Sequence, residues 1–367
     1  MDFNIRVRKS LTNFSSYVPD KVNYKIRLNS NESPFNESNN FLLNLVYKRV
    51  FKSSSINRYP DSSQAVLKKE VSQFYGLKSN QILFGNGSDE LILYLLLSLT
   101  GKTSKVLYLE PSFSMYKILT KALGLKGIGV SLNSDFSLNL AKVLSKIKKE
   151  DPDLIFIASP NNPTGNSFDK SDIIEITKSS KGLVVIDEAY SDYSSDSCLS
   201  LLKKNKNLLI MKTMSKIGFA ALRLGYLIGD KQILNAVNKI RLPYNISSLS
   251  QLVATDFFKN SELLEKQIEA VKKERSKVFN FLSRIQDLKV FESDSNFILF
   301  EVKRSKRLFE LLKKENIIVK NFPKTNKLEN CLRVSIGLPK ENKRFMSVVS
   351  SFLVKYSKKT EEDDIVE

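Results

Sequence analysis

Between residues 81 and 230 the sequence alternates short apolar runs with amphipathic stretches, and this pattern constrains the fold more than any other feature. Six runs are apolar along almost their whole length: 82–84, 106–109, 154–158, 183–186, 208–211 and 226–228. Strands are apolar throughout when both faces of their sheet are covered. Strands that alternate with helices are typical of a mostly parallel sheet with crossover helices. We therefore predict an α/β fold in which ligands bind beyond the carboxyl ends of the strands.

The pattern changes toward the C-terminus. Residues 230–284 are helical in pattern, with a break near Pro243. Short strands and two helices then follow, with strands at 288–290, 296–302, 317–320 and 332–336 and helices at about 304–315 and 339–356. This segment predicts a smaller α+β unit behind the large sheet.

A length of 367 residues is typical of two domains or one large domain. Ahead of the sheet we predict helices near 38–51 and at 62–75, the second ended by Gly76. The predicted organisation is an N-terminal arm that packs with the small domain (1–45), a large domain that carries the sheet and its ligand site (46–245), a small C-terminal domain (246–357) and a disordered charged tail (358–367).

Composition excludes several kinds of site. The chain has no histidine, which removes histidine-based triads, histidine metal ligands and histidine general bases. Cys198 and Cys331 are too few for a disulfide framework or a thiolate metal site, so we predict no metal and a reducing, cytoplasmic location. The longest apolar run, 91–99, is too short to cross a bilayer, and the N-terminus lacks the apolar stretch of a secretory signal.

The net charge of +19 raises the question of a nucleic-acid partner. The 58 lysines and arginines are spread along the whole chain, however, and no basic block is interleaved with aromatic residues at a recognised spacing. We predict small, anionic substrates and no nucleic-acid or membrane partner, because a basic field attracts phosphates and carboxylates.

The segment 212–226 places an amine beside a hydroxyl and a guanidinium. Lys216 follows Ser215 directly, and Arg223 lies seven residues further on in a small, apolar context. A lysine that reacts with an aldehyde needs a partly desolvated pocket, where its pKa falls. A phosphate needs a hydroxyl donor and a planar cation nearby. Taken alone, the same segment would also fit a surface lysine beside a helix start.

Two glycine- and proline-rich turns follow predicted strands. In 84–90, glycines permit close backbone approach, Ser88 can cap the next helix, and the free N–H groups there suit an anion. In 159–165, two prolines and a glycine present the Asn162 amide on a rigid turn. The alternatives are an ordinary capped turn and an ordinary rigid loop.

Two charged residues lie in predicted strands. Asp187 ends a buried strand, where a carboxylate requires a cation such as a protonated pyridine nitrogen, and Tyr190 follows three residues later. A metal at Asp187 is an alternative, but the phosphate loop of nucleotide-binding proteins is absent. Arg333 lies in a late strand, where a guanidinium can grip a carboxylate or phosphate, or can simply face solvent.

Together these stretches resemble the fold-type I pyridoxal-phosphate aminotransferases from about Tyr17 to Gly337. The fold implied is a large domain with a mostly parallel sheet flanked by helices plus a smaller C-terminal α+β domain. Within this family the chain looks most similar to the histidinol-phosphate aminotransferases, on the motifs at 17–20, 28–35, 58–61, 187–193 and 242–251.

The resemblance implies that the cofactor is pyridoxal 5'-phosphate and that Lys216 binds it covalently. Asp187 would bond the ring nitrogen, and Asn162 and Tyr190 would bond the ring hydroxyl. Phe113, where many relatives have tyrosine, would stack on the ring.

The same resemblance implies how the phosphate of the cofactor is held. Ser215, Arg223 and the backbone around Ser88 and Asp89 would bind it. Tyr59 would reach it from the partner subunit, since sites of this family are built across a homodimer. In many relatives this arginine lies eight residues after the lysine, whereas Arg223 lies seven residues after Lys216.

For substrates, the resemblance implies that Arg333 grips the carboxylate of glutamate and the phosphate of the second substrate in turn. Tyr17, Asn31 and Glu32 would lie at the substrate pocket. Lys320 would also bind substrate, at a position where many relatives carry arginine.

The implied reaction converts L-histidinol phosphate and 2-oxoglutarate to imidazole-acetol phosphate and L-glutamate, a step of histidine biosynthesis. Two alternatives on the same scaffold stay open. One is an aminotransferase for aromatic or other amino acids, and the other is a threonine-phosphate decarboxylase.

Overall fold

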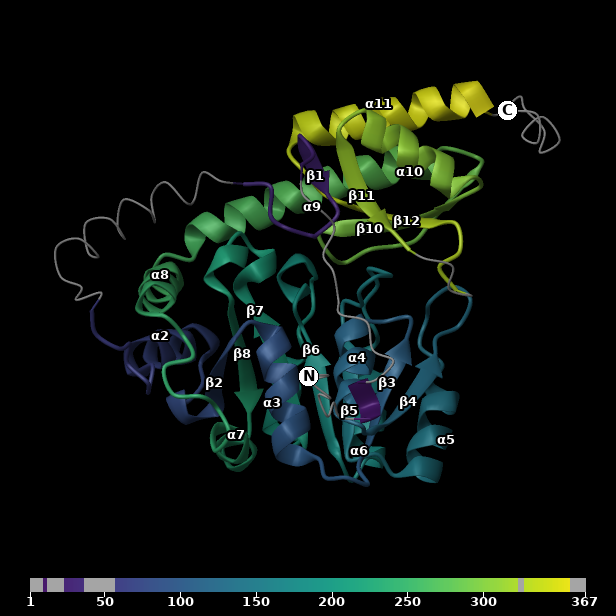
Figure 1. Ribbon diagram of the computed structural model, residues 1–367. Coiled ribbons are helices and arrows are strands. Elements are labelled where there is room, and N and C mark those ends of the chain that lie inside the picture. Colours follow the sequence, from purple (N-terminus) through teal and green to yellow (C-terminus); the bar gives the residue numbers. More distant parts are fainter. Residues whose placement is uncertain (1–8, 12–22, 36–56, 323–326, 357–367) are drawn as a thin grey trace, which may run out of the picture.

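The computed structural model describes residues 9–11, 23–35, 57–322 and 327–356, and it places two β-sheets one above the other (Figure 1). The larger sheet has seven strands and the smaller has five. The helix predicted near 38–51 and the tail predicted at 358–367 lie outside the described residues. The predicted domain boundaries stay predictions.

The seven-stranded sheet has the order β2-β8-β7-β6-β5-β3-β4. Its strands are β2 (Ile82–Asn86), β3 (Lys105–Glu110), β4 (Lys126–Ser131), β5 (Leu154–Ala158), β6 (Leu183–Asp187), β7 (Leu208–Thr213) and β8 (Leu224–Gly229). Strand β8 runs antiparallel to both of its neighbours, and the other pairs are parallel. The structure therefore confirms the predicted mostly parallel α/β sheet.

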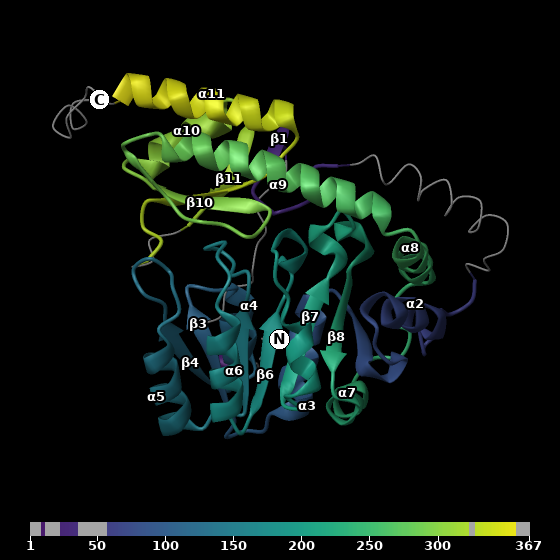
Figure 2. The same cartoon turned by 180° about the vertical axis from the view of Figure 1, so that it is seen from behind.

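Helices cover both faces of this sheet (Figures 1 and 2). One face carries α3 (Ser88–Leu99), α4 (Ser114–Ala122) and α7 (Lys231–Asn238), and the other carries α5 (Leu140–Glu150) and α6 (Lys170–Ser179). In β6, Val185 packs into the cluster on the α3 side, and its neighbours Val184 and Ile186 pack into the other cluster. Both faces exclude water, which explains why the strands are continuously apolar.

Strand β4 was not predicted from the sequence. It forms the edge of the large sheet beside β3, and only Ile128 and Val130 of its six residues are buried. Gly127 and Gly129 alternate with these two apolar residues, so the segment lacks the continuous apolar run that marked the central strands.

Helix α2 (Ala65–Tyr75) begins three residues later than the predicted helix at 62–75. The Asp61 carboxylate accepts hydrogen bonds from the backbone N–H groups of Ser63 and Ala65, which forms a turn ahead of the helix. Gly76 ends the helix in the left-handed conformation, φ 63°, as the sequence predicted.

The five-stranded sheet has the order β1-β11-β12-β10-β9. Its strands are β1 (Ile26–Leu28), β9 (Leu288–Val290), β10 (Phe297–Val302), β11 (Ile317–Asn321) and β12 (Cys331–Ser335). Helices α10 (Ser305–Lys314) and α11 (Pro339–Tyr356) cover it, and β1 pairs with β11 in parallel, so an N-terminal segment completes the C-terminal sheet.

The two sheets are joined by a helical connection. It consists of α8 (Ser248–Lys259), which packs beside α2, and the long α9 (Glu262–Ser283), which runs up to the small sheet (Figure 2). Short 3₁₀ helices complete the described elements: η1 (Lys9–Leu11), η2 (Ser79–Gln81), η3 (Ser191–Tyr193), η4 (Cys198–Lys203), η5 (Met214–Lys216) and η6 (Ala220–Leu222). Within the described ranges, none of the helices has the length and apolar character needed to cross a membrane.

Candidate active site

The predicted site residues gather at the carboxyl ends of the central strands, on the side that faces the small sheet. Asp187 is the last residue of β6, and Lys216 ends η5 just after β7. Asn162 follows β5, and Arg333 approaches from β12 of the small sheet. Parallel strands bring their carboxyl ends to one edge, so residues far apart in sequence meet here.

Asp187 is a buried carboxylate, with 4% of its surface exposed. Its Oδ2 accepts a hydrogen bond from the Tyr116 hydroxyl (2.6 Å), and its Oδ1 accepts one from the backbone N–H of Ala189 (3.0 Å). Burial raises the pKa of Asp187 to about 6, although both hydrogen bonds and the nearby Lys216 oppose this shift. A cation placed against this carboxylate would relieve the cost of its burial.

Tyr116 was not identified as a site residue from the sequence. It is fully buried, and its ring stacks on Phe156 with centroids 4.8 Å apart and planes 3° apart. Burial, and then the Asp187 charge, raise the pKa of Tyr116, so the hydroxyl stays protonated and donates to that carboxylate. Tyr116 lies one helical turn after Phe113, a predicted site residue, and this i, i+3 spacing on α4 was the available signal.

Lys216 presents a half-buried amine. Its Nζ donates to the backbone oxygen of Ser30 at 3.3 Å and lies 5.8 Å from the centroid of the Tyr190 ring. The backbone oxygen of Lys216 accepts a hydrogen bond of 2.7 Å from the hydroxyl of Tyr193, which fixes the turn of η5. Lys216 thus lies where its charge acts on Asp187.

Three consecutive residues, 29–31, connect the predicted site residues to one another. Asn29 accepts a hydrogen bond from Arg333 through its backbone oxygen, and Ser30 accepts one from Lys216. The Asn31 amide donates to the Tyr190 hydroxyl at 2.9 Å.

Asn31 is buried and left-handed, with φ 55°, and it is held by the small sheet. Its backbone N–H donates to the Ser335 hydroxyl at 2.9 Å, its side-chain oxygen accepts from the same hydroxyl, and its backbone oxygen accepts from Asn296. Glu32 next to it pairs with Arg27 at 2.8 Å. The N-terminal segment is therefore part of the site wall.

Arg333 is a buried guanidinium that reaches across to the large sheet. It donates to the side-chain oxygen of Asn162 and to the backbone oxygen of Asn29, and it lies 4.9 Å from the Phe297 ring centroid. Lys320 of β11 lies directly opposite Arg333 in the antiparallel ladder, so the two cations share one face of the small sheet.

The start of α3 lies against Arg223. Gly87 has φ 82°, a conformation that other residues rarely adopt, and a Cβ built on it would lie 2.5 Å from the end of the Arg223 side chain. Arg223 pairs with Asp89 at 3.2 Å, and both side chains are about half exposed. The prediction that Ser88 caps this helix is wrong: Gly87 occupies the cap and Ser88 is the first helical residue. The N–H groups of that first turn have no partners within the helix, which suits an anion.

Three further predicted residues lie as follows. Ser215 is buried, and its hydroxyl accepts a hydrogen bond from Thr213 at 3.0 Å. Phe113 packs edge-on against Tyr116 with ring centroids 5.6 Å apart. Tyr17 lies outside the described residues.

Tyr59 lies away from this cluster. Its side chain is 81% exposed and stacks on Tyr244, with ring centroids 4.6 Å apart. The structure thus brings together the Lys216 amine, the buried Asp187 carboxylate, Arg223 at the start of α3, and the cations of the small sheet. It leaves Tyr59 at the surface. Within the described part of the chain, no three His, Cys, Asp or Glu side chains form a group that could hold a metal.

Comparison with known proteins agrees with this arrangement. The family model for aminotransferase class I and II matches residues 23–349. The chain is 40% identical to a histidinol-phosphate aminotransferase of Vesicomyosocius okutanii, over 90% of this chain and 92% of that protein. It is 33% identical to the one of Thermoanaerobacter pseudethanolicus, over 95% and 99%. The crystal structure of the histidinol-phosphate aminotransferase from Clostridium acetobutylicum superposes with a TM-score of 0.81 at 26% identity, covering 90% of this chain and 99% of that one.

Proposed function

Because the chain belongs to the class I and II aminotransferase family, we propose that it transfers an amino group between L-glutamate and a phosphorylated keto compound. The substrates we infer are L-histidinol phosphate and 2-oxoglutarate, which give imidazole-acetol phosphate and L-glutamate in histidine biosynthesis. The names and high coverage of the curated relatives support this choice. The observation that carries the cofactor chemistry is the buried Asp187 carboxylate beside the Lys216 amine.

The family depends on pyridoxal 5'-phosphate, and the residues present fit this group. Asp187 is a buried carboxylate with a raised pKa, which a protonated ring nitrogen would neutralise. The Arg223 guanidinium lies directly against the Cα of Gly87 at the start of α3, so a cation and the helix N–H groups are side by side, which fits a phosphate. The protonated ring and the phosphate of the cofactor would thus each meet a side chain of opposite charge, Asp187 and Arg223.

We assign the ring contacts to Asp187 at the ring nitrogen, to Asn162 and Tyr190 at the ring hydroxyl, and to Phe113 on the ring face. The hydrogen bond that Tyr116 donates favours the ionised form of Asp187. The bond from Asn31 orients the Tyr190 hydroxyl.

We assign the phosphate contacts to Arg223, to the Ser215 hydroxyl and to the N–H groups of Ser88 and Asp89. Arg223 supplies a planar cation and the start of α3 supplies a partial positive charge. The Asp89 carboxylate, now paired with Arg223, would turn away from the anion.

Lys216 is the residue that we expect to move the proton. When bound, the cofactor would supply an electron sink and an aldehyde that the Lys216 amine could hold covalently. The Nζ of Lys216 would act as the general base that takes the proton from the substrate Cα, and then as the acid that delivers it to the carbon of the former aldehyde. The contact with the Ser30 backbone oxygen keeps the amine in the site.

We infer that Arg333 and Lys320 bind the anionic ends of the two substrates. Both cations lie on the face of the small sheet that meets the large sheet, and Arg333 already reaches Asn162 there. The guanidinium can bind a carboxylate through two hydrogen bonds, whereas lysine contributes a point charge. Asn31 and Glu32 would flank this pocket, as would Tyr17.

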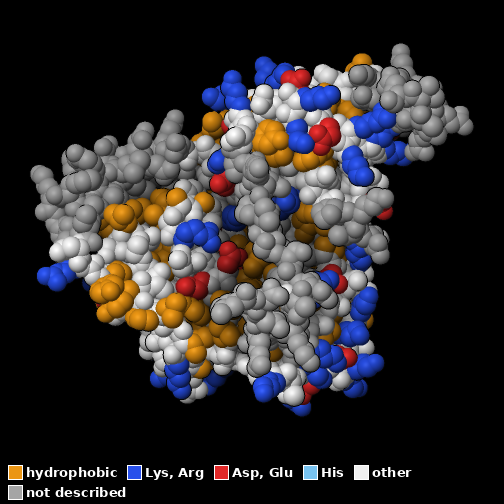
Figure 3. Space-filling view, viewed as in Figure 1, with side chains coloured by type: hydrophobic (Ala, Val, Ile, Leu, Met, Phe, Trp, Pro, Cys, Tyr) orange, Lys and Arg blue, Asp and Glu red, His pale blue; other side chains and the backbone are white. Residues whose placement is uncertain are grey.

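We propose that the protein is a homodimer and that Tyr59 binds the cofactor phosphate of the partner subunit. Among the residues that the structure describes, the exposed large apolar side chains other than Leu11 and Val354 come from two segments, 59–97 and 240–249. Contacts join these segments, since Tyr59 stacks on Tyr244 and the backbone N–H of Leu242 donates to Tyr94. Figure 3 shows apolar side chains gathered on this side of the molecule. A patch of this kind marks an interaction surface.

We further propose a cytoplasmic location. Cys198 and Cys331 are both buried and unpaired, which is compatible with a reducing compartment.

The proposed function is tested with the purified protein and pyridoxal phosphate. Borohydride reduction followed by peptide mass spectrometry should place the cofactor on Lys216. Glutamate should change the absorbance of the bound cofactor, and imidazole-acetol phosphate should restore it while phenylpyruvate should not. We expect Lys216→Ala to lose about 10²–10⁴-fold or more in turnover, the worth of a general base.

Two outcomes would contradict the proposal. Cofactor attached to another lysine would refute the assignment of Lys216. Restoration of the cofactor absorbance by phenylpyruvate alone would point to an aminotransferase for aromatic amino acids. Release of carbon dioxide without conversion of the cofactor to its amino form would point to a decarboxylase. Lys239→Ala, on a lysine just after α7, is the matched control and should keep full turnover.

A further inference from the structure

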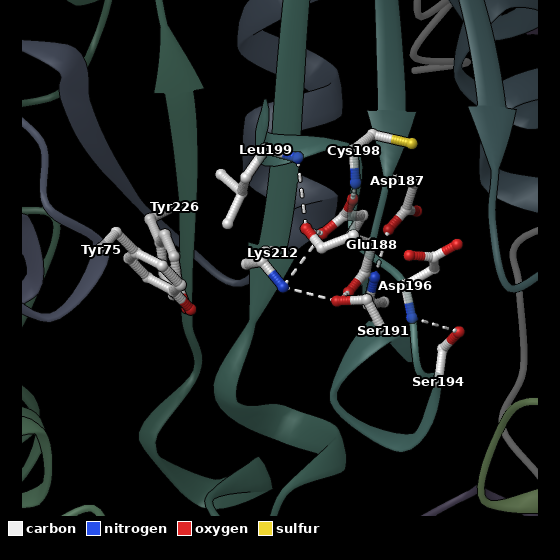
Figure 4. Close-up of polar contacts among 12 residues, drawn as sticks. Tyr75, Asp187, Glu188, Ser191, Ser194, Asp196, Cys198, Leu199, Lys212 and Tyr226 are labelled. Atoms are coloured by element: carbon white, nitrogen blue, oxygen red, sulfur yellow. Dashed lines mark hydrogen bonds and ion pairs between the residues drawn. The ribbon is translucent and has the colours of Figure 1, made fainter. Parts of the chain in front are cut away.

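A buried charged network lies beside the proposed cofactor site (Figure 4). Lys212 of β7 and Glu188 just after β6 form an ion pair of 3.1 Å, with only 5% and 1% of their side chains exposed. The Lys212 amine also donates to the hydroxyl of Ser191. None of these three residues has a role in the function proposed above.

Both partners of the pair make further hydrogen bonds. The carboxylate of Glu188 accepts hydrogen bonds from the Ser197 hydroxyl (2.7 Å) and from the backbone N–H of Cys198 (2.5 Å). Ser191, which accepts from Lys212, donates in turn to the backbone oxygen of Glu188. Burial lowers the pKa of Lys212, but the carboxylates of Asp192 and Glu188 prevail and raise it, so this amine stays charged.

The network joins the ends of β6 and β7 at the point where the hydrogen-bonded ladder between these two strands stops. Strands β6 and β7 pair only as far as Asp187 opposite Met211. Beyond that point, β6 is followed by the loop at 188–193, and β7 continues to Thr213 and then into η5. The side chain of Lys212 links the two segments beyond the ladder through its ion pair with Glu188. Beside this ion pair, the backbone N–H of Glu188 donates a hydrogen bond of 2.8 Å to the backbone oxygen of Met211.

Each network residue is a close chain neighbour of a residue assigned to the cofactor. Glu188 follows Asp187, Ser191 follows Tyr190, and Lys212 precedes Lys216 by four residues. A buried ion pair contributes little net stability, because desolvation of the charges offsets their attraction. A role in positioning the neighbouring site residues therefore explains this buried ion pair better than a contribution to the stability of the fold.

We propose that Lys212 is a positioning residue: its bonds to Glu188 and Ser191 set Asp187 and Tyr190 at a fixed distance from the amine of Lys216. This deepens the proposed function and rests on it for its consequence, although the cross-link itself exists without cofactor. Side chains that orient metal ligands typically contribute about 10- to 100-fold to affinity, and we expect the same range for the cofactor here.

The test compares three variants with the wild-type protein. Lys212→Met leaves Glu188 buried without its cation. The double variant Lys212→Met/Glu188→Met removes both charges and is expected to fold as stably as the wild type. Ser191→Ala removes one hydrogen bond and is the mildest change. The matched control is Lys277→Met, which breaks a 2.7 Å pair with the buried Glu274 on α9.

Two measurements decide the outcome. In cofactor-free protein, hydrogen exchange should accelerate by about tenfold or more at both 188–193 and 213–217 in Lys212→Met, as expected when a cross-link between two segments opens. In loaded protein, the cofactor dissociation constant should rise about 10- to 100-fold in the double variant and about two- to tenfold in Ser191→Ala. Lys277→Met should change neither.

The positioning role would be overturned if the double variant and Ser191→Ala both bound the cofactor as tightly as the wild type does. Exchange that accelerates at only one of the two segments would show that Lys212 does not link them. If the wild type binds no cofactor at Lys216, the proposed function fails, and the exchange measurement still decides whether the cross-link exists. Lys212→Arg, which keeps the cation, should restore binding to within about threefold if charge and reach are what matter.

Discussion

Replacing Asp187 with asparagine should stabilise the cofactor-free protein while disabling its proposed site. In the folded chain burial raises the pKa of Asp187 to about 6, against an ordinary value of 3.8 for an aspartate. Above pH 6 the folded protein must hold a buried charge that the unfolded chain solvates freely. At about 1.36 kcal/mol per pKa unit, this shift costs about 3 kcal/mol at pH 8.

The sign follows from proton binding. Between the two pKa values the folded state binds the additional proton, so the stability contributed by this carboxyl falls as pH rises from about 4 to about 6. Asparagine has the same shape and carries no charge at any pH. The Tyr116 hydroxyl can turn to accept from its amide. The stability gain of Asp187→Asn should therefore be below about 1 kcal/mol at pH 4 and about 3 kcal/mol at pH 8.

Urea unfolding of cofactor-free protein across pH 4–8 measures this difference directly. Glu175→Gln is the control, because it neutralises an exposed carboxyl on α6 that water solvates in both the folded and the unfolded chain. Pyridoxal phosphate should stabilise the wild type much more than the variant, because only the carboxylate meets the ring nitrogen with a charge. A variant that is less stable than the wild type at pH 8, or whose gain does not change with pH, would refute this reasoning.

Three further predictions concern other parts of the site. Tyr116→Phe removes a hydrogen bond to a buried charge, worth about 1.5–3 kcal/mol, so the midpoint of the pH-dependent stability attributed to Asp187 should move up by about 1–2 units; an unmoved midpoint would contradict the bond. Arg333→Lys loses the bidentate grip, so steady-state kinetics should show KM for 2-oxoglutarate raised about tenfold or more with a smaller change in kcat, and a lowered kcat at constant KM would argue for a different role. Leu242→Glu places a charge on the exposed apolar surface, so sedimentation should show monomers where the wild type sediments as a dimer; an unchanged dimer would move the interface elsewhere.

The sequence by itself determined the architecture. Hydrophobic runs and their spacing depend on local burial, so the central strands and the helices between them could be located before any contact was known. The same holds for the motif residues at strand ends, because in a parallel sheet the end of a strand is where a ligand site forms. Asp187 and Asn162 were found this way, whereas Lys216 was predicted from Ser215 and Arg223 in the segment 212–226. Strand β4 was missed because an edge strand is only partly buried and needs no continuous apolar run.

Only the tertiary structure decided which side chains meet. The hydroxyl of Tyr116 and the carboxylate of Asp187 are 71 positions apart in the chain, and Lys216 and Ser30 are 186 apart. Arg333 reaches the backbone oxygen of Asn29 across 304 positions. A hydrogen bond is directional and extends about 3 Å, so it forms only after the whole sheet has set the two groups in register. Sequence patterns report burial, which is a property of one segment, whereas such contacts belong to pairs of segments.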